Sequence, residues 1–227
     1  MSGHLPPYIG TNVEILNYRP LLLLVHGFMS KQLSAAVVDY AAGSNLGRLK
    51  VATDKNSSTK GIVDQAYRAA NGKFVKKHGQ PPFDEISHRV ANFFGIDLVS
   101  TEPFNLISYD PGGHSVPHFD YIWGQISDND WWHITHGNRI ATFFLIAQTA
   151  EEGGGTIFPE LGVSVRPAAG DALFWFNMRA DGDLEPGLLH AACPVVKDNN
   201  NHQAASKKWI RTSSNDATDC TFLLDDA

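Results

Sequence analysis

Two histidines and one aspartate are the residues of this chain best suited to bind a redox-active metal ion. His118 and Asp120 are two positions apart in the stretch Pro117–Tyr121, and His190 follows much later. In a β-strand, side chains two positions apart point to the same side, so one strand could offer an imidazole and a carboxylate to one ion. A third ligand from a neighbouring strand would complete a two-histidine, one-carboxylate face, which leaves positions on ferrous iron open and suits oxygenase chemistry.

A His-x-Asp pair alone is weak evidence, because a protein of this size can carry one by chance on the polar face of an exposed strand. The surrounding sequence is far more specific. Five segments follow one another along the chain: Tyr109–Gly113 (YDPGG), Gly137–Thr142 (GNRIAT), Gly154–Glu160 (GGTIFPE), Gly170–Trp175 (GDALFW) and His190–Val195 (HAACPV). In this order and spacing the sequence resembles the catalytic domain of the prolyl 4-hydroxylases, the collagen-type branch of the 2-oxoglutarate and iron(II)-dependent oxygenases. The resemblance extends from about Glu14 to Cys220.

The second half of the chain has the periodicity of short strands separated by Gly and Pro turns, which is typical of an all-β sandwich or barrel. The predicted strands are Phe104–Tyr109, His118–Ile122, Arg139–Ala147, Thr156–Phe158, Val163–Arg166, Ala172–Phe176, Leu188–Ala191, Pro194–Lys197 and Ser206–Thr212. The resemblance narrows this to a double-stranded β-helix, the cupin-like jelly roll. The expected fold class is therefore mainly β with flanking α-helices.

The N-terminal part is predicted to supply two strands and a set of helices that pack on one side of the jelly roll. In order, these are strands at Glu14–Tyr18 and Leu21–Val25, a helix from Ser30 to Gly43, a helix near Gly61–Ala70, and a helix from Pro81 that ends at Gly95. The Ser30 hydroxyl is suited to cap the first helix, and Gly43 to end it. The apolar run Leu21–Val25 is expected to be buried on both faces.

The length and net charge of the chain limit its domain count and the kinds of partner it can have. A chain of 227 residues is long enough for one domain with a full core, here divided into N-terminal strands and helices (1–103), a jelly roll (104–213) and a tail (214–227). The net charge of -6 and the lack of a basic run exclude nucleic acid as the main partner. No apolar stretch approaches the ~20 residues of a membrane helix, so no membrane association is expected.

The two cysteines, Cys193 and Cys220, bear on the cellular compartment. A bond between them would stabilise the fold by about 3 to 4 kcal/mol on the loop-entropy model, but two separate buried thiols are an equal alternative from the sequence alone. In the resembled family, a cysteine after the distal histidine pairs with one near the C-terminus, which implies a disulfide. Such a bond favours the endoplasmic reticulum lumen or the secretory pathway. The residues Met1–His4 show no secretory signal, which leaves a cytoplasmic location as the alternative.

The resemblance also implies the cofactors: Fe(II) on the three ligands named above, 2-oxoglutarate, and ascorbate as reductant. Tyr109 and Thr156 match family positions that line the 2-oxoglutarate pocket, although ordinary strand packing would also explain them. Trp209 matches an active-site tryptophan, whereas Trp175 is expected to pack in the core.

The sequence departs from the family at the lysine that would neutralise the distal carboxylate of 2-oxoglutarate. A charge-assisted contact to such a buried carboxylate is worth about 1.5 to 3 kcal/mol. Six residues before Trp209, where the family carries the lysine, this chain has Gln203. Lys207 lies two residues before Trp209 and so faces the same side, whereas Lys208 faces away. Lys207, Lys197 or the neutral Gln203 could take the role.

Substrate contacts are implied at three further positions. Arg139 and Arg211 match positions that face the peptide, although the family usually has a histidine at the second. The segment Tyr121–Gly137, which includes Trp123, is predicted to be a lid or substrate loop. Aromatic walls suit the polyproline II form of proline-rich peptides, and a contact with a partner subunit or a second copy is the alternative.

The function predicted from these residues is peptidyl-proline 4-hydroxylation of proline-rich peptides or proteins, with decarboxylation of 2-oxoglutarate to succinate. Two alternatives stay open. One is a related 2-oxoglutarate oxygenase that acts on a non-proline substrate. The other, motivated by the missing pocket lysine, is a catalytically silent peptide-binding module.

Overall fold

Two antiparallel β-sheets form the body of the protein in the computed structural model, which describes residues 12–49, 66–76, 79–94, 101–122, 131–197 and 203–211. The larger sheet has the spatial order β1 (Val13–Tyr18), β2 (Leu21–Val25), β12 (Ala172–Phe176), β8 (Arg139–Gln148), β15 (Gln203–Arg211), β6 (Phe104–Tyr109), β5 (Asn71–Val75) and β3 (Gly47–Arg48). The smaller sheet has the order β11 (Val163–Val165), β10 (Thr156–Phe158), β13 (His190–Ala192), β7 (His114–His118) and β4 (Arg68–Ala69). A separate ribbon pairs β14 (Val195–Lys197) with β9 (Glu152–Gly153).

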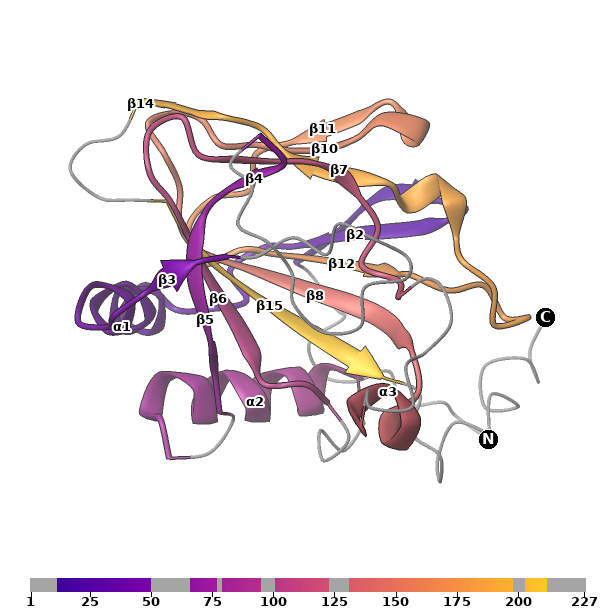
Figure 1. Ribbon diagram of the computed structural model, residues 1–227, viewed down its shortest axis with the longest axis horizontal. Helices are drawn as coiled ribbons and strands as arrows, with labels where there is room; N and C mark the ends of the chain where they lie inside the picture. The colour runs from indigo at the N-terminus through magenta and orange to yellow at the C-terminus, as the bar shows by residue number, and fades with distance from the viewer. Residues whose placement is uncertain are drawn as a thin grey trace.

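The strand period of two divides the apolar side chains between two cores. On β8, Phe143 and Leu145 belong to the core under the helices, whereas Phe144 and Ile146 belong to a core with Phe158 of the smaller sheet. The larger sheet therefore has helices on one face and the smaller sheet on the other, as Figure 1 shows. This layering is the predicted double-stranded β-helix with helices on one side.

The helices α1 (Lys31–Ala42) and α2 (Pro81–Phe94) confirm two of the three predicted N-terminal helices. The Ser30 hydroxyl accepts a hydrogen bond from the backbone N–H of Leu33 at 3.1 Å, and Gly43 is the C-cap residue. The apolar stripe of α2 is buried in the helix-side core; its members are Phe83, Ile86, Val90 and Phe93. Among the described residues, none of the helices is long and apolar enough to cross a membrane.

The helix predicted near Gly61–Ala70 is wrong where the structure describes it. Residues 66 and 67 form a turn, and β4 follows at Arg68–Ala69, while residues 61–65 lie outside the described residues. Arg68 pairs with Ser115 and Ala69 with His114, so β4 extends the edge of the smaller sheet. Pairing with β7 thus overrides the local helical spacing, because backbone hydrogen bonds and burial outweigh intrinsic propensity.

The strand predicted at His118–Ile122 is also wrong, because β7 is His114–His118 and the chain bends after it. The amide side chain of Asn138 binds the next segment in place of a neighbouring strand. It accepts from the N–H of Ile122 at 3.0 Å and donates to the carbonyl of the same residue at 3.1 Å. Asp120 therefore lies in a bend rather than on the strand that carries His118.

Smaller shifts affect other predicted elements. The strand predicted at Leu188–Ala191 begins later, since η2 (Pro186–Leu188) is a 3-10 turn and β13 starts at His190. The predicted loop Tyr121–Gly137 contains a short helix, α3 (Trp131–His136). The division of the chain at residues 103 and 213 stays a prediction.

Candidate metal centre

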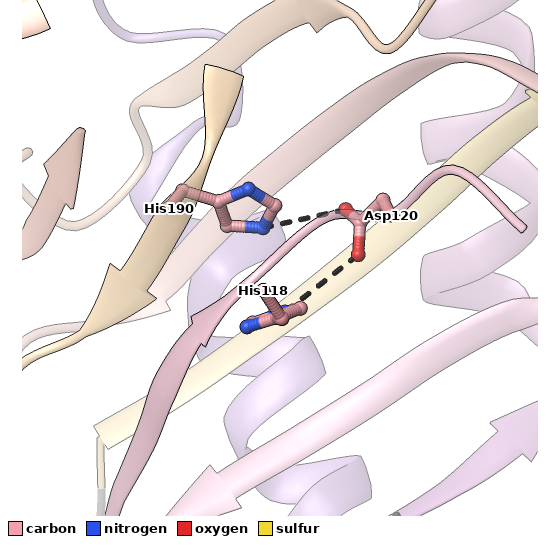
Figure 2. A group of neighbouring side chains, drawn as sticks. All are labelled: His118, Asp120 and His190. Carbon is pink, nitrogen blue, oxygen red and sulfur yellow. Dashed lines mark ion pairs between the residues drawn. The ribbon is translucent and has the colours of Figure 1, made fainter. Parts of the chain in front are cut away.

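The three predicted ligands converge between the two sheets. His118 is the last residue of β7 and His190 the first of β13, and the two are direct register partners. Their Nε2 atoms lie 3.8 and 3.6 Å from the two carboxylate oxygens of Asp120 (Figure 2). All the candidate donor atoms lie within 4.8 Å of one another, and this is the one such group of His, Cys, Asp and Glu among the described residues. Asp120 thus completes the face from a bend, not from the strand position that the spacing predicted.

The two imidazoles are held with Nε2 toward the carboxylate. The Nδ1 of His118 lies 2.8 Å from the carbonyl oxygen of Val116, and the Nδ1 of His190 lies 3.1 Å from that of Leu188. Because a carbonyl oxygen only accepts, each Nδ1 must carry the proton, which leaves the lone pair on Nε2. Burial, followed by the positive charge of Lys207, lowers the pKa of His190 to about 4, so its ring is neutral at neutral pH. A neutral imidazole with a free Nε2 is the metal-binding form.

A chain of buried hydrogen bonds supports Asp120 from the larger sheet. The Thr142 hydroxyl on β8 donates to the Oδ2 of Asp120 at 2.9 Å and accepts from the Nδ2 of Asn177 at 2.9 Å. The indole N–H of Trp175 donates in turn to the Oδ1 of Asn177 at 2.8 Å. Thr142 and Trp175 are fully buried, and Asn177 nearly so. Trp175 packs in the core, as predicted, and its ring also lies edge-on to His190, with 4.8 Å between centroids.

A cation of the protein lies at the centre of this face. The ammonium Nζ of Lys207 is 3.0 Å from each carboxylate oxygen of Asp120, 3.0 Å from the Nε2 of His190 and 3.4 Å from that of His118. Burial alone would raise the pKa of Asp120, but Lys207 and the two histidines hold it well below its usual value. The carboxylate is therefore charged, and the donor set of two neutral nitrogens and one anion surrounds a point that already attracts a cation. This is the donor set that ferrous iron takes in oxygenases.

Lys207 and Lys208 face opposite sides of β15, as the strand parity predicted. Lys208 is fully buried on the helix side, where its ammonium group lies 4.4 Å from the ring centroid of Phe104 and donates to the carbonyl of Glu102 at 2.5 Å. Lys197, the second cation considered for the 2-oxoglutarate pocket, lies at the surface on β14 and pairs with Glu151. The side chain of Gln203 lies outside the described residues.

Tyr109 and Thr156 are both buried, on β6 and β10. Burial raises the pKa of Tyr109, while the charges of Arg68 and Asp120 act on it in opposite directions, so its hydroxyl stays protonated near this centre. Trp209 is also buried, and the Nζ of Lys207 lies 6.0 Å from its ring centroid. The roles of these three residues in binding 2-oxoglutarate stay predictions.

The two predicted substrate arginines share one carboxylate. Arg139 donates to both oxygens of Glu102 at 2.7 and 3.0 Å, and Arg211 donates to one of them at 2.6 Å. The guanidinium carbon of Arg139 also lies 3.5 Å from the ring centroid of Trp209. Arg211 is nearly fully buried, whereas part of Arg139 is exposed. Trp123, the third predicted substrate contact, lies outside the described residues.

Sequence reasoning missed Arg68, a second cation beside the metal ligands. Its guanidinium donates to the hydroxyl of Ser115 at 3.2 Å, and one of its terminal nitrogens lies 3.3 Å from the Nε2 of His118. Arg68 belongs to the short edge strand β4, which the sequence pattern assigned to a helix. The pairing of β4 with β7 would have been the signal, but a two-residue strand has no detectable periodicity.

The predicted disulfide is not supported. Cys193 is a half-buried free cysteine, and its predicted partner, Cys220, lies outside the described residues. The compartment inferred from that bond stays a prediction.

The similarity of this chain to known proteins agrees with an iron site built from two histidines and one carboxylate. A family model described as "2OG-Fe(II) oxygenase superfamily" matches residues 104–211. The prolyl 4-hydroxylase subunit alpha-2 of Caenorhabditis elegans is 32% identical over 206 residues, which are 91% of this chain and 37% of that protein. The human prolyl 4-hydroxylase subunit alpha-1 is 32% identical over 192 residues, covering 85% of this chain and 34% of that protein. The chain thus spans about a third of the length of these relatives.

The fold of the chain is also similar to that of a solved prolyl hydroxylase structure. The crystal structure of the viral collagen prolyl hydroxylase from Paramecium Bursaria Chlorella virus-1, in complex with 2OG, matches with a TM-score of 0.65 and 21% identity. The match covers 84% of this chain and 96% of that one, which confirms the predicted double-stranded β-helix. With its His118, Asp120 and His190 facial triad between two sheets of this fold, the chain belongs to the 2OG-Fe(II) oxygenase superfamily.

Proposed function

We propose that this protein is a peptidyl-proline 4-hydroxylase that couples hydroxylation of proline in proline-rich peptides to decarboxylation of 2-oxoglutarate. The observation that carries the proposal is the convergence of two neutral Nε2 atoms and one charged carboxylate around a single point. The similarity to prolyl 4-hydroxylase alpha subunits supports the choice of proline as the substrate.

The triad would hold Fe(II). Iron with bound 2-oxoglutarate supplies the oxidising chemistry, while the protein supplies placement and a closed site. The contribution of this chain is to keep both histidines neutral, because burial lowers the pKa of each imidazole, and to keep Asp120 charged. Hydrogen bonds fix all three side chains. Because the three ligand side chains are already fixed, they need to move less when the ion binds.

For 2-oxoglutarate, we expect a cationic pocket in place of the family lysine. Lys207 and Arg68 are two cations whose charged groups lie beside ligand side chains, and a carboxylate that enters this buried region requires such a partner. Tyr109 and Thr156 would line the same pocket with hydroxyl groups. Arg68→Met should therefore raise the Michaelis constant for 2-oxoglutarate more than Lys197→Met, a surface control.

A wall for an extended peptide is expected beside the triad. The ring of Phe74 is more than half exposed and lies 6.3 Å from that of Trp209, centroid to centroid. Arg139 stacks on Trp209 from its own strand. Aromatic surfaces beside a hydrogen-bond donor suit the polyproline II helix.

The test is a turnover assay with Fe(II), ascorbate, 2-oxoglutarate and a proline-rich peptide. Succinate should form together with a mass gain of about 16 Da on a peptide proline, as one oxygen atom is inserted by this cofactor chemistry. Succinate without modified proline would favour an oxygenase with a different substrate. Neither product from iron-loaded protein would favour a silent peptide-binding module. His118→Ala is the matched control and should give neither product.

A further inference from the structure

Lys207 makes the same contacts that a metal ion in the triad would need. Its ammonium group donates toward both oxygens of Asp120 and toward the Nε2 of His190, all at 3.0 Å, and it lies 3.4 Å from the Nε2 of His118. The side chain is nearly fully buried, so these contacts are made away from bulk water. No other described lysine approaches the three ligands.

The contacts to the histidines are mutually exclusive with metal binding. A neutral imidazole with its proton on Nδ1 has a single lone pair on Nε2. That lone pair either binds an ion or accepts a hydrogen bond, from Lys207 at His190 and from Lys207 or Arg68 at His118. The backbone carbonyls of Val116 and Leu188 fix the proton on the opposite nitrogens. The carboxylate of Asp120 has spare lone pairs, but it cannot hold two cations at the same position without repulsion.

We propose that Lys207 is an internal competitor for the metal, whose ammonium group must leave the triad before a divalent ion can bind, so that this residue sets the metal affinity of the site. The proposal extends the metal site described above and does not depend on the identity of the substrate. Without a bound ion, the buried lysine is tolerated because Asp120 compensates its charge at 3.0 Å.

The surroundings offer the displaced ammonium group other favourable contacts. The ring centroids of Phe144, Trp175 and Trp209 lie 5.7, 5.9 and 6.0 Å from the Nζ of Lys207. Aromatic faces attract cations, and the lysine side chain has a flexible four-carbon stem. Displacement therefore need not expose the charge to an apolar environment without a partner.

The first test compares metal affinities, with Mn²⁺ titrated calorimetrically into chelator-treated full-length protein without 2-oxoglutarate or peptide. Lys207→Met keeps an unbranched side chain, one atom shorter, and removes the competing charge, so Mn²⁺ should bind about 10- to 100-fold more tightly, the range expected from losing a charge-assisted competitor. Lys208→Met, on the opposite face of the same strand, is the matched control and should bind like the wild type. Equal or weaker binding by Lys207→Met overturns the proposal.

A second test uses wild-type protein and so does not depend on the folding of a variant. Crystals grown with and without Ni²⁺ should differ at Lys207: its Nζ should contact Asp120 without the ion and lie beyond hydrogen-bond distance with it. Nζ still bonded to both carboxylate oxygens beside a bound ion would refute the competition. Because neither readout involves turnover, failure of this proposal and failure of the proposed hydroxylase activity can be told apart.

Discussion

Removing the hydroxyl group of Thr142 should weaken the metal site without touching a ligand. Thr142→Val keeps the shape of the side chain, but it deletes the donor to Asp120 at 2.9 Å and the acceptor for Asn177 at 2.9 Å. A hydrogen bond to a charged group contributes about 1.5 to 3 kcal/mol, and a buried amide left without its partner costs about 1 to 3 kcal/mol more. Because both groups are buried, we expect a loss of about 2.5 to 6 kcal/mol in the free energy of unfolding.

The metal affinity should fall by about 10- to 100-fold, as is usual when a partner of a metal ligand is removed. Urea unfolding of metal-free protein measures the first quantity, and calorimetric titration with Mn²⁺ measures the second. Thr142→Ser is the control, because it keeps the hydroxyl and loses only a methyl group. If Thr142→Val binds Mn²⁺ as tightly as Thr142→Ser does, the hydrogen bond to Asp120 has no part in holding the site.

Three further changes test individual contacts of the fold. Burial alone would raise the pKa of Glu102, but Arg139 and Arg211 hold that pKa below its usual value. A carboxyl group of this kind stabilises the fold at pH values above its pKa in the unfolded chain, and the stabilisation is lost as the pH falls through its pKa in the folded protein. The difference in urea stability between wild type and Glu102→Gln should therefore shrink between about pH 6 and about pH 3, and a constant difference would contradict the ion pairs. Ser30→Ala should cost about 0.5 to 2 kcal/mol through the lost helix cap, while unchanged stability would show that the cap is dispensable. Gly153→Ala should cost about 1 to 3 kcal/mol in urea unfolding, because the residue has φ +78° and a Cβ would collide with the carbonyl of Pro194; wild-type stability would rule out that close approach.

The ligand set could be predicted from the sequence because it depends on residue type and on a specific set of flanking segments. His118, Asp120 and His190 meet as expected, although the argument that placed two of them on one strand was wrong. The correct position of Asp120 depends on Asn138, whose side chain binds the backbone of Ile122 across 16 positions in sequence. A local pattern contains no information about such a contact.

The charges around the ligands were harder to foresee. Strand parity correctly separated Lys207 from Lys208, because it follows from backbone geometry alone. It did not reveal that Lys207 reaches the metal ligands themselves, since the reach depends on how closely β15 lies to β7 and β13. Arg68 was missed for a similar reason: β4 exists only through its pairing with β7.

Metal stoichiometry tests the central claim most directly. Chelator-treated wild-type protein, titrated anaerobically with Fe(II), should bind one ion per chain, and His190→Ala should bind none at the same concentrations while retaining its fold by circular dichroism. Retention of one tightly bound ion by folded His190→Ala would contradict the assignment of the triad.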